Sequence, residues 1–233
     1  MDRTTLAFLG GLAHELRTPL GAIGGYAELM ELGVHGPVSP AQIDGLGRIR
    51  RNQALMVSLL NAFMAYAEVA AGDVELAPTA VSLRSALHDA IASLATSADA
   101  RSIRVELLTG ALLSTQDVTL HVDPDALDTL LVEVLRDAVE SSPIGGEVRV
   151  SLSAGDGRSR IEVQGSGEAI DAEGAEAAFR PFDRDGKGGR TSASPHALSL
   201  PHARLLARLL GGDVEAVTSS PLRTVIVDLV GTS

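Results

Sequence analysis

Two long apolar heptad stripes at the start of the chain constrain its fold more than any other feature. Within residues 3–32, apolar side chains recur at alternating spacings of three and four, the seam of a long amphipathic helix: Leu6, Leu9, Ala13, Leu16, Leu20, Ile23, Ala27 and Met30. Glycines at 33 and 36 and Pro37 end this pattern. Ser39 and Pro40 then supply an N-cap and a first-turn proline for a second helix over about 40–71. The sequence therefore predicts a helical hairpin.

The second helix has two neighbouring apolar stripes. One contains Leu46, Ile49, Gln53, Met56, Leu60, Phe63 and Ala67, and the other contains Leu55, Leu59, Ala62, Tyr66 and Val69. One partner helix cannot cover so wide an apolar face, so we expect two hairpins to associate as a homodimeric four-helix bundle. Alternatively, the second stripe packs against the domain that follows.

A change of composition at 71–78, AGDVELAP, predicts a hinge. Beyond it, helical patterns (82–97, 124–141, 171–179 and 197–210) alternate with strand patterns (103–108, 118–122, 147–153, 160–164) and a closing hairpin (213–230). A polar Gly/Ser stretch at 183–195 is expected to be a loop. The predicted fold class is α+β: a helical hairpin domain over 1–72, then an α/β sandwich domain over 73–233 whose largely antiparallel sheet lies on a helical layer.

Composition excludes several classes of protein. The chain has no cysteine, which rules out disulfides, thiol catalysis and cysteine-ligated metals. Its net charge of −11 argues against nucleic acid or an anionic membrane as the main partner. No uninterrupted apolar run approaches the roughly 18 residues of a membrane span, and MDRTTLAF lacks the features of a secretory signal. We therefore expect a cytoplasmic protein.

The segment AHELRTPLGAI, residues 13–23, places polar, chemically reactive side chains within the otherwise apolar pattern of the first helix. His14 offers an imidazole nitrogen as nucleophile for a phosphoryl group, and Glu15 is placed to bond the other ring nitrogen or accept its proton. Thr18 shares a helix face with His14, and Pro19 is expected to kink the helix. A zinc-protease site is excluded because Thr18 stands where His-Glu-x-x-His needs its second histidine. The alternative for His14 is a solvated helix residue.

These residues resemble the phospho-acceptor box of the HisKA dimerisation domain, and the chain as a whole resembles a sensor histidine kinase core with a GHKL-type ATP-binding domain. The resemblance implies that His14 is the phospho-acceptor and that Thr18 orients water for dephosphorylation of a partner's phospho-aspartate. It implies a response-regulator receiver domain as partner. Candidate docking residues are Arg17, Arg48, Arg50 and Arg51, although a merely solvated face explains the last three equally well.

The first nucleotide box departs from the family. Segment 123–150 aligns without gaps on the N box, where the family has one Asn near the phosphates, a second Asn on Mg²⁺ and a Lys on phosphate. This chain has Glu133, Asp137 and Glu140 at those positions. Asp137 retains oxygen ligands that suit Mg²⁺. Glu140 reverses the charge where a triphosphate would lie, and we expect the added carboxylates to repel it.

The other two boxes depart as well. In the glycine box at 162–182, Gly165 replaces the family's adenine-binding Asp, Gly167 is retained and Ala169 replaces a glycine. In the final box at 194–206, Ala197 and Ser199 replace glycines that let the backbone approach phosphate. The stiffening prolines Pro195 and Pro201 flank them, and the GKGG segment at Lys187 lacks the spacing of a P-loop.

The preferred interpretation is an ATP-independent histidine phosphotransfer protein, similar to ATP-less phosphotransferases that descend from histidine kinases. It would be a homodimer that needs no cofactor and exchanges phosphoryl groups with a receiver domain. One alternative is an active sensor histidine kinase core with an atypical site for ATP and Mg²⁺. Another is a non-catalytic dimeric scaffold. The remaining histidines are expected to be structural or solvated: His35, His88, His121, His196 and His202.

Overall fold

The computed structural model describes residues 2–108, 118–155, 157–182, 197–218, 220 and 222–230. The chain divides into two compact units, Met1–Asp73 and Val74–Ser233. The predicted loop at 183–195, with Lys187 and Pro195, and the neighbouring His196 lie outside the described residues.

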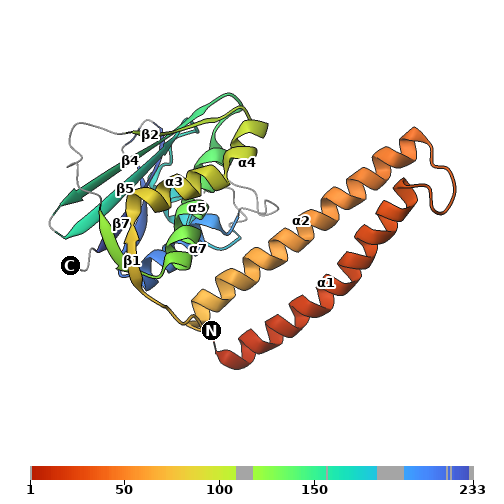
Figure 1. The fold of residues 1–233 in the computed structure, drawn as a ribbon, viewed down its shortest axis with the longest axis horizontal. Helices are drawn as coiled ribbons and strands as arrows, with labels where there is room; N and C mark the ends of the chain where they lie inside the picture. Colours follow the sequence, from red (N-terminus) through yellow and green to blue (C-terminus); the bar gives the residue numbers. More distant parts are fainter. Residues whose placement is uncertain are drawn as a thin grey trace. The chain divides into compact units, whose positions relative to one another are not determined.

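The first unit is the predicted helical hairpin, formed by α1 (Arg3–Glu31) and α2 (Pro40–Ala71) (Figure 1). Asp2 caps α1 by accepting a hydrogen bond of 2.7 Å from the Thr5 amide. Ser39 and Gln42 form a reciprocal capping box at the start of α2. Gly72 ends α2 in the left-handed conformation, with φ of 69°. Both helices therefore begin and end where side-chain chemistry predicts.

The hairpin core is built from small and medium apolar side chains. Leu6, Ala13, Met64 and Ala67 form its buried cluster, against which Leu9, Leu60, Phe63 and Ala71 pack. Leu20, Ala27 and Leu46 continue the buried seam toward the turn. Leu6, Ala13, Leu20 and Ala27 are one position of each heptad in the predicted first stripe, whereas Leu16, Ile23 and Met30 of the same stripe are exposed. The periodicity of the sequence therefore predicts the buried seam only in part.

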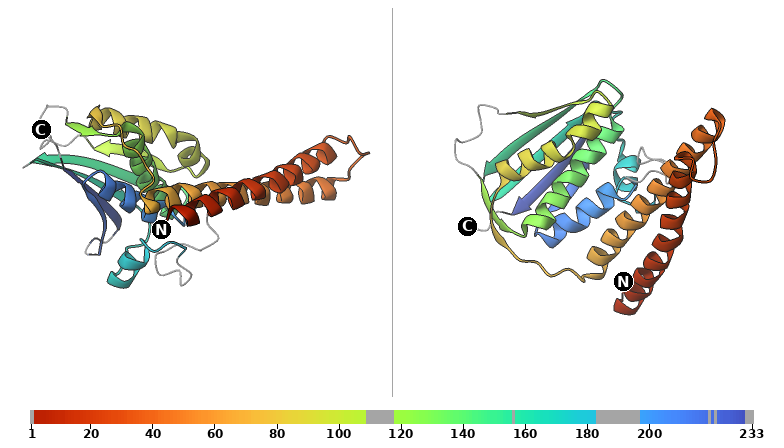
Figure 2. Two further views of the ribbon diagram at one scale, coloured as in Figure 1. Left: turned by 90° about the horizontal axis from the view of Figure 1, so that it is seen from below. Right: turned by 45° about the vertical axis from the view of Figure 1, so that its right-hand side comes forward.

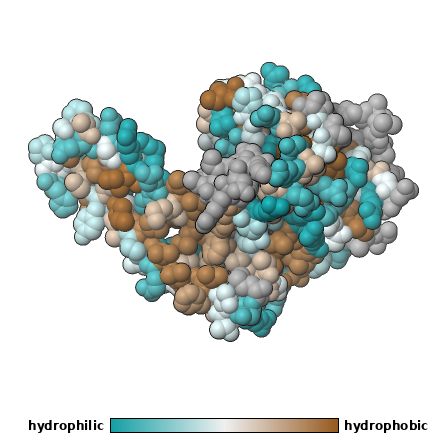
Figure 3. Space-filling view, turned by 180° about the vertical axis from the view of Figure 1, so that it is seen from behind, coloured by the Kyte–Doolittle hydropathy of each residue, from teal (hydrophilic) through white to brown (hydrophobic). Residues whose placement is uncertain are grey.

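A second apolar surface of the hairpin remains exposed in the single chain. We call it the apolar face, and its members are Phe8, Leu12, Leu16, Ile23, Tyr26, Leu29, Met30, Leu32, Val34, Ile43, Ile49 and Met56. Hydrophobic patches on the hairpin arm are visible in Figure 3. Exposed large apolar side chains in this number on one hairpin indicate an interaction site.

By length and composition, α2 is long and apolar enough to cross a membrane. Polar residues interrupt its apolar run, but the mean hydropathy of an 18-residue window tolerates them. The core helix of a soluble protein has the same length and composition.

The second unit contains a five-stranded sheet in the order β2-β4-β5-β7-β6. Strands β2 and β4 run parallel, and every other neighbouring pair in this sheet is antiparallel. A separate antiparallel pair joins β1 to β3. The strands are β1 (Thr79–Ser82), β2 (Arg104–Leu108), β3 (Thr119–Val122), β4 (Glu147–Gly155), β5 (Arg158–Gly165), β6 (Asp213–Val217) and β7 (Arg223–Val230).

Helices α3, α5 and α7 lie on one face of this sheet (Figure 2). The helices of the unit are α3 (Leu83–Ser93), α4 (Ala95–Ala100), α5 (Pro124–Ser141), α6 (Ala172–Ala177) and α7 (Ser199–Leu209). The α5 helix buries leucines and valines against the sheet and the neighbouring helices, including Leu127, Leu130 and Leu135. The predicted α+β class is therefore confirmed.

The structure differs from the sequence prediction in two elements. The predicted helix over 82–97 is divided at Leu94 into α3 and α4, and the Ser93 hydroxyl donates 2.7 Å to the Ala90 carbonyl there, in competition with the helical ladder. The short strand β1 was not predicted, because four residues paired only with β3 give too little alternation to detect.

Candidate functional site

His14 lies on the exposed side of α1, one residue after the buried Ala13. The Thr18 hydroxyl donates to the His14 carbonyl over 3.5 Å, so Thr18 lies one turn along the same face. Pro19 follows inside the helix and lacks the amide that would bond the Glu15 carbonyl. His14 and Thr18 are therefore both open to an approaching partner.

Glu15 is exposed, and no hydrogen bond joins its carboxylate to the His14 ring among the described residues. Adjacent residues on a helix point about 100° apart, so they do not face each other. A contact between Glu15 and His14 therefore needs rotamers other than those seen in the single chain.

The four arginines expected at a docking surface lie in two places. Arg17 donates two hydrogen bonds, of 2.9 and 3.3 Å, to Asn61 on α2, which hold it beside His14. Arg50 pairs with Glu31 at 2.6 Å near the hairpin turn, and Arg48 and Arg51 are exposed on the same stretch of α2. Since Glu31 follows His14 by 17 residues, this cluster lies about 25 Å from His14 along the helix.

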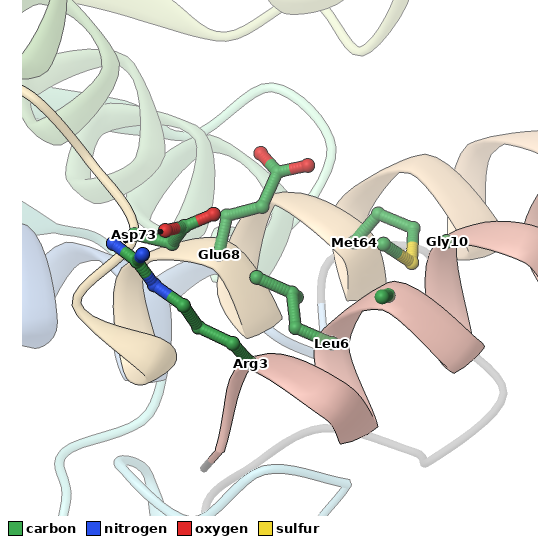
Figure 4. A pocket seen from close by; sticks show the side chains of 7 residues that line it. Arg3, Leu6, Gly10, Met64, Glu68 and Asp73 are labelled. Atoms are coloured by element: carbon green, nitrogen blue, oxygen red, sulfur yellow. Dashed lines mark ion pairs between the residues drawn. The ribbon is translucent and has the colours of Figure 1, made fainter.

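A shallow hollow of about 530 Å³ lies at the other end of the hairpin (Figure 4). Leu6 and Met64 contribute apolar surface, and Arg3 forms an exposed ion pair of 3.3 Å with Asp73 at its rim. The lining includes Gly10, one turn before His14. The lining also includes the exposed Glu68, and the charged side chains at the rim are largely solvated.

In the second unit, Glu133, Asp137 and Glu140 lie at i, i+4 and i+7 on α5, and each has a cationic neighbour. Glu133 is mostly buried. Its carboxylate lies 3.4 Å from Arg136 and 3.9 Å from the Nδ1 atom of the buried His202. Burial raises the pKa of Glu133, but His202, Ser199 and Arg136 together outweigh it and hold the pKa below its usual range.

Asp137 forms a buried ion pair with Arg223 at the start of β7. The guanidinium Nε atom donates to Oδ2 over 3.1 Å and Nη2 donates to Oδ1 over 3.3 Å, so both carboxylate oxygens are engaged. The side chains are 4% and 0% exposed. The second unit thus places a guanidinium on the carboxylate that the sequence leaves able to hold Mg²⁺.

Glu140 lies 3.8 Å from Arg101, which also donates to the Glu140 and Ser142 carbonyls over 3.3 and 2.9 Å. Arg101 therefore neutralises Glu140 and caps the C-terminal end of α5. Within the described residues, no group of three or more histidine, aspartate or glutamate side chains could hold a metal ion.

Gly165 and Gly167 lie where strand β5 and the turn after it approach α5 closely. A Cβ atom at Gly165 would lie 3.0 Å from Ser142 Oγ and 3.1 Å from the Ala138 carbonyl oxygen. At Gly167 it would lie 2.5 Å from the Ser141 carbonyl oxygen. Gly167 is therefore required for packing and Gly165 is tightly packed, whereas Ala169 is exposed.

At the start of α7, Ala197 and Ser199 are buried, 5% and 3% exposed. The capping position, Leu198, makes no side-chain cap hydrogen bond, and Pro201 is buried in the first turn. The positions expected to cradle phosphate are thus packed into the interior of the unit.

Arg223 and Arg101 are the two residues of this region that sequence reasoning missed. For Arg223 a signal was present: alternation along RTVIVDLV places it on the same face as Val225, Val227 and Leu229, which are buried. An arginine in register with a buried apolar row requires an internal carboxylate, and Asp137 was a candidate. Arg101 has no such signature, because it follows a short helix.

Comparison with known proteins gives two domain matches. Residues 5–72 match the His Kinase A (phospho-acceptor) domain, and residues 122–230 match the Histidine kinase-, DNA gyrase B-, and HSP90-like ATPase family. Histidine protein kinase DivJ of Caulobacter vibrioides is 28% identical over 207 residues, which cover 89% of this chain and 34% of that protein. Cell-division control histidine kinase PdhS of Brucella canis is 30% identical over 177 residues, covering 75% of this chain and 17% of that protein. The chain thus spans about a third or less of these relatives.

Solved structures share the fold. Full-length ShkA in complex with AMPPNP aligns over 100% of this chain and 47% of that one, with a TM-score of 0.77 and 22% identity. Histidine kinase ThkA in complex with the response regulator protein TrrA aligns over 99% of this chain and 64% of that one, with a TM-score of 0.65 and 19% identity.

Proposed function

The chain belongs to the histidine kinase family of two-component signal transduction, and from this premise we propose that it is a dimeric histidine phosphotransfer protein that works without ATP. A phosphoryl group passes between His14 and the aspartate of a response-regulator receiver domain. The second unit is then a pseudokinase lobe with a structural and docking role. The observation that carries the proposal is the buried pair of Asp137 with Arg223.

The transfer chemistry requires an exposed nucleophile and an activated phosphoryl donor, and His14 meets the first requirement. A ring nitrogen of His14 attacks the phosphorus of the aspartyl phosphate, the bond from phosphorus to the aspartate oxygen breaks, and the carboxylate leaves. The acyl phosphate is already activated, so no nucleotide is consumed. Glu15 accepts the ring proton in a rotamer that the docked partner selects, and Thr18 positions water for dephosphorylation of the partner.

The nucleotide end of the second unit does not fit a magnesium-bound nucleotide. Mg²⁺ needs carboxylate or amide oxygens at about 2.0–2.1 Å, and both oxygens of Asp137 already accept from Arg223. Gly165 supplies no side chain to bond an adenine amino group, and Glu133 and Glu140 add negative charge beside the phosphates. Ala197 and Ser199 are packed inward and are not open to a ligand.

Dimerisation is supported by the apolar face of the hairpin and by the match to the phospho-acceptor domain. A second copy that covers this face completes a four-helix bundle, which also accounts for the apolar character of α2 without a membrane. On this basis we propose a cytoplasmic location. Because ThkA was crystallised with a response regulator, we propose that a receiver domain docks beside His14, where Arg17 offers positive charge. The receiver contacts Arg48, Arg50 and Arg51 only if it also reaches the turn.

A second candidate is an active histidine kinase core with an atypical ATP site. It is favoured by the presence of both matched domains and by the likeness to ShkA, which was crystallised with a nucleotide analogue. The two candidates differ in the source of the phosphoryl group on His14.

The experiment incubates the protein with a panel of phosphorylated receiver domains, and separately with radiolabelled ATP and Mg²⁺. We expect acid-labile, base-stable label to reach His14 from at least one receiver and none to reach it from ATP. His14→Gln removes the label, whereas His35→Gln, an exposed histidine of the same hairpin, retains it. Labelling from ATP alone would refute the proposal and establish the second candidate, and failure of every receiver to label His14 would refute phosphotransfer.

A further inference from the structure

The pair of Arg223 and Asp137 joins two elements that are distant in sequence, α5 and β7, in the interior of the second unit. A buried carboxylate must be paired or must coordinate a metal, because an isolated charge in a medium of low dielectric is costly. The planar guanidinium offers two parallel donors, and here it uses them on both oxygens of Asp137.

The neighbouring positions are arranged around this arginine. Gly165 on β5 is the register partner of Arg223 on β7, and cross-strand partners lie on the same face of a sheet. A side chain at 165 would therefore stand beside Arg223 and against the Ala138 carbonyl of α5. The Arg223 amide also donates 3.3 Å to the Gly167 carbonyl. One packed cluster is thus formed by Arg223, Asp137 and the two glycines, Gly165 and Gly167.

We propose that Arg223 is the built-in counter-ion of this site: its guanidinium holds Asp137 in place of a divalent cation and so closes the nucleotide end of the domain. This inference rests on the proposed ATP-independent function, and it names the residue that enforces it. An arginine cannot be deprotonated at physiological pH, so the closure is permanent and does not depend on a ligand.

The neighbouring strands β5 and β7 also supply a matched control, an exposed ion pair. Arg160 of β5 forms a bidentate pair with Asp228 of β7 at 2.8 and 2.9 Å, shorter than the buried pair. Its side chain is 56% exposed, so water screens the interaction. Judged by hydrogen-bond distances alone, the pair of Arg160 and Asp228 would contribute more to stability. Judged by burial, the loss of Arg223 from its pair with Asp137 should cost more stability.

The experiment measures the Tm of the full chain for the wild type, Arg223→Ala, Asp137→Asn with Arg223→Ala, and Arg160→Ala. Each is melted in MgCl₂, in NaCl of equal ionic strength, and with Mg²⁺ and ATP together. We expect Arg223→Ala to lower the Tm by about 6–20 °C and Arg160→Ala to lower it by about 4 °C or less. The double variant should recover part of the loss, because Asn removes the uncompensated charge.

Magnesium provides the deciding readout. At ten times its Kd, Mg²⁺ should raise the Tm of Arg223→Ala by about 3–6 °C, while the wild type does not respond. An Arg223→Ala protein that does not respond to Mg²⁺, or whose Tm equals that of the wild type, would overturn the inference and leave the ATP-independent function standing. If Mg²⁺ and ATP together raise the Tm of the wild type, both the inference about Arg223 and the proposed ATP-independent function are refuted.

Should Arg223→Ala fail to fold, the double variant decides. A folded double variant supports the counter-ion role, because removal of the Asp137 charge then suffices to restore the domain. An unfolded double variant overturns it, because Arg223 would then be needed for packing and not for neutralising Asp137.

Discussion

Replacing Gly167 with alanine tests the close approach of the turn after β5 to the end of α5. The new Cβ would lie 2.5 Å from the Ser141 carbonyl oxygen, whereas ordinary contact begins at 3.4 Å, so the two segments must separate by about 0.9 Å. The φ angle of Gly167 is not positive, which makes the effect purely steric.

Neither side of this contact is free to move. The end of α5 is held by Arg101, which donates 2.9 Å to the Ser142 carbonyl, and by the Ser142 hydroxyl, which donates 2.8 Å to the Ala138 carbonyl. The turn is held by the bond from the Arg223 amide to the Gly167 carbonyl. Overpacking of a fixed contact costs about 1–3 kcal/mol, which corresponds to a fall in Tm of roughly 2–12 °C for a unit of this size.

Thermal unfolding followed by calorimetry measures the effect, and Gly155→Ala is the control. A Cβ at Gly155 meets nothing within 4 Å, so its Tm should stay within about 2 °C of the wild type. The packing argument is wrong if Gly167→Ala is as stable as Gly155→Ala.

Three further predictions concern charge, assembly and helix capping. His202, Ser199 and Arg136 hold the pKa of Glu133 below that of an ordinary glutamate in the folded protein. Its contribution to stability is therefore present above the ordinary glutamate pKa and is lost as pH falls through the lowered one. Glu133→Gln should lower the Tm at pH 7 and flatten its decline between pH 5 and 3, and an unchanged decline counts against the assignment. Ile23→Glu with Tyr26→Glu should convert the dimer to monomer in light scattering with helicity retained by circular dichroism, and a dimer that persists contradicts the proposed interface. Ser39→Ala should cost the hairpin about 1 kcal/mol in denaturant unfolding, compared with no effect of Ser58→Ala, and equal stabilities would show that the capping box contributes nothing.

Local rules predicted most of the fold. The heptad stripes, the glycine at 33 and the Ser39-Pro40 start define α1 and the beginning of α2 because capping chemistry and helical period act within a few residues. The same holds for Asp123 and Pro124 at the start of α5. The strand β1 was not predictable, since it depends on pairing with the remote β3. The break at Leu94 was not predicted, although the Ser93 hydroxyl that bonds the Ala90 carbonyl there is a local feature.

The candidate site was predictable in its residues but not in its connections. The motif at residues 13–23 identifies His14, and helical period places it on an exposed face. Sequence reasoning left Asp137 open to a metal, because its partner Arg223 lies 86 residues away on another element. The sequence shows that the nucleotide-binding residues of the family are replaced. It does not show that Arg223 contacts Asp137, because that contact depends on the register of β7 in the sheet.

The position of β7 has a consequence for biosynthesis. It is the last in sequence of the described strands, yet it lies between β5 and β6 in the sheet, so the sheet cannot be completed before residue 230 has been synthesised. The helical hairpin is complete at Ala71, 159 residues earlier, an interval of about 8–32 s at 5–20 residues per second. During that interval Asp137 has been made without the arginine that neutralises it. A nascent chain stalled before residue 223 therefore carries a finished hairpin and an unclosed second unit, the form that cellular proteases should remove first.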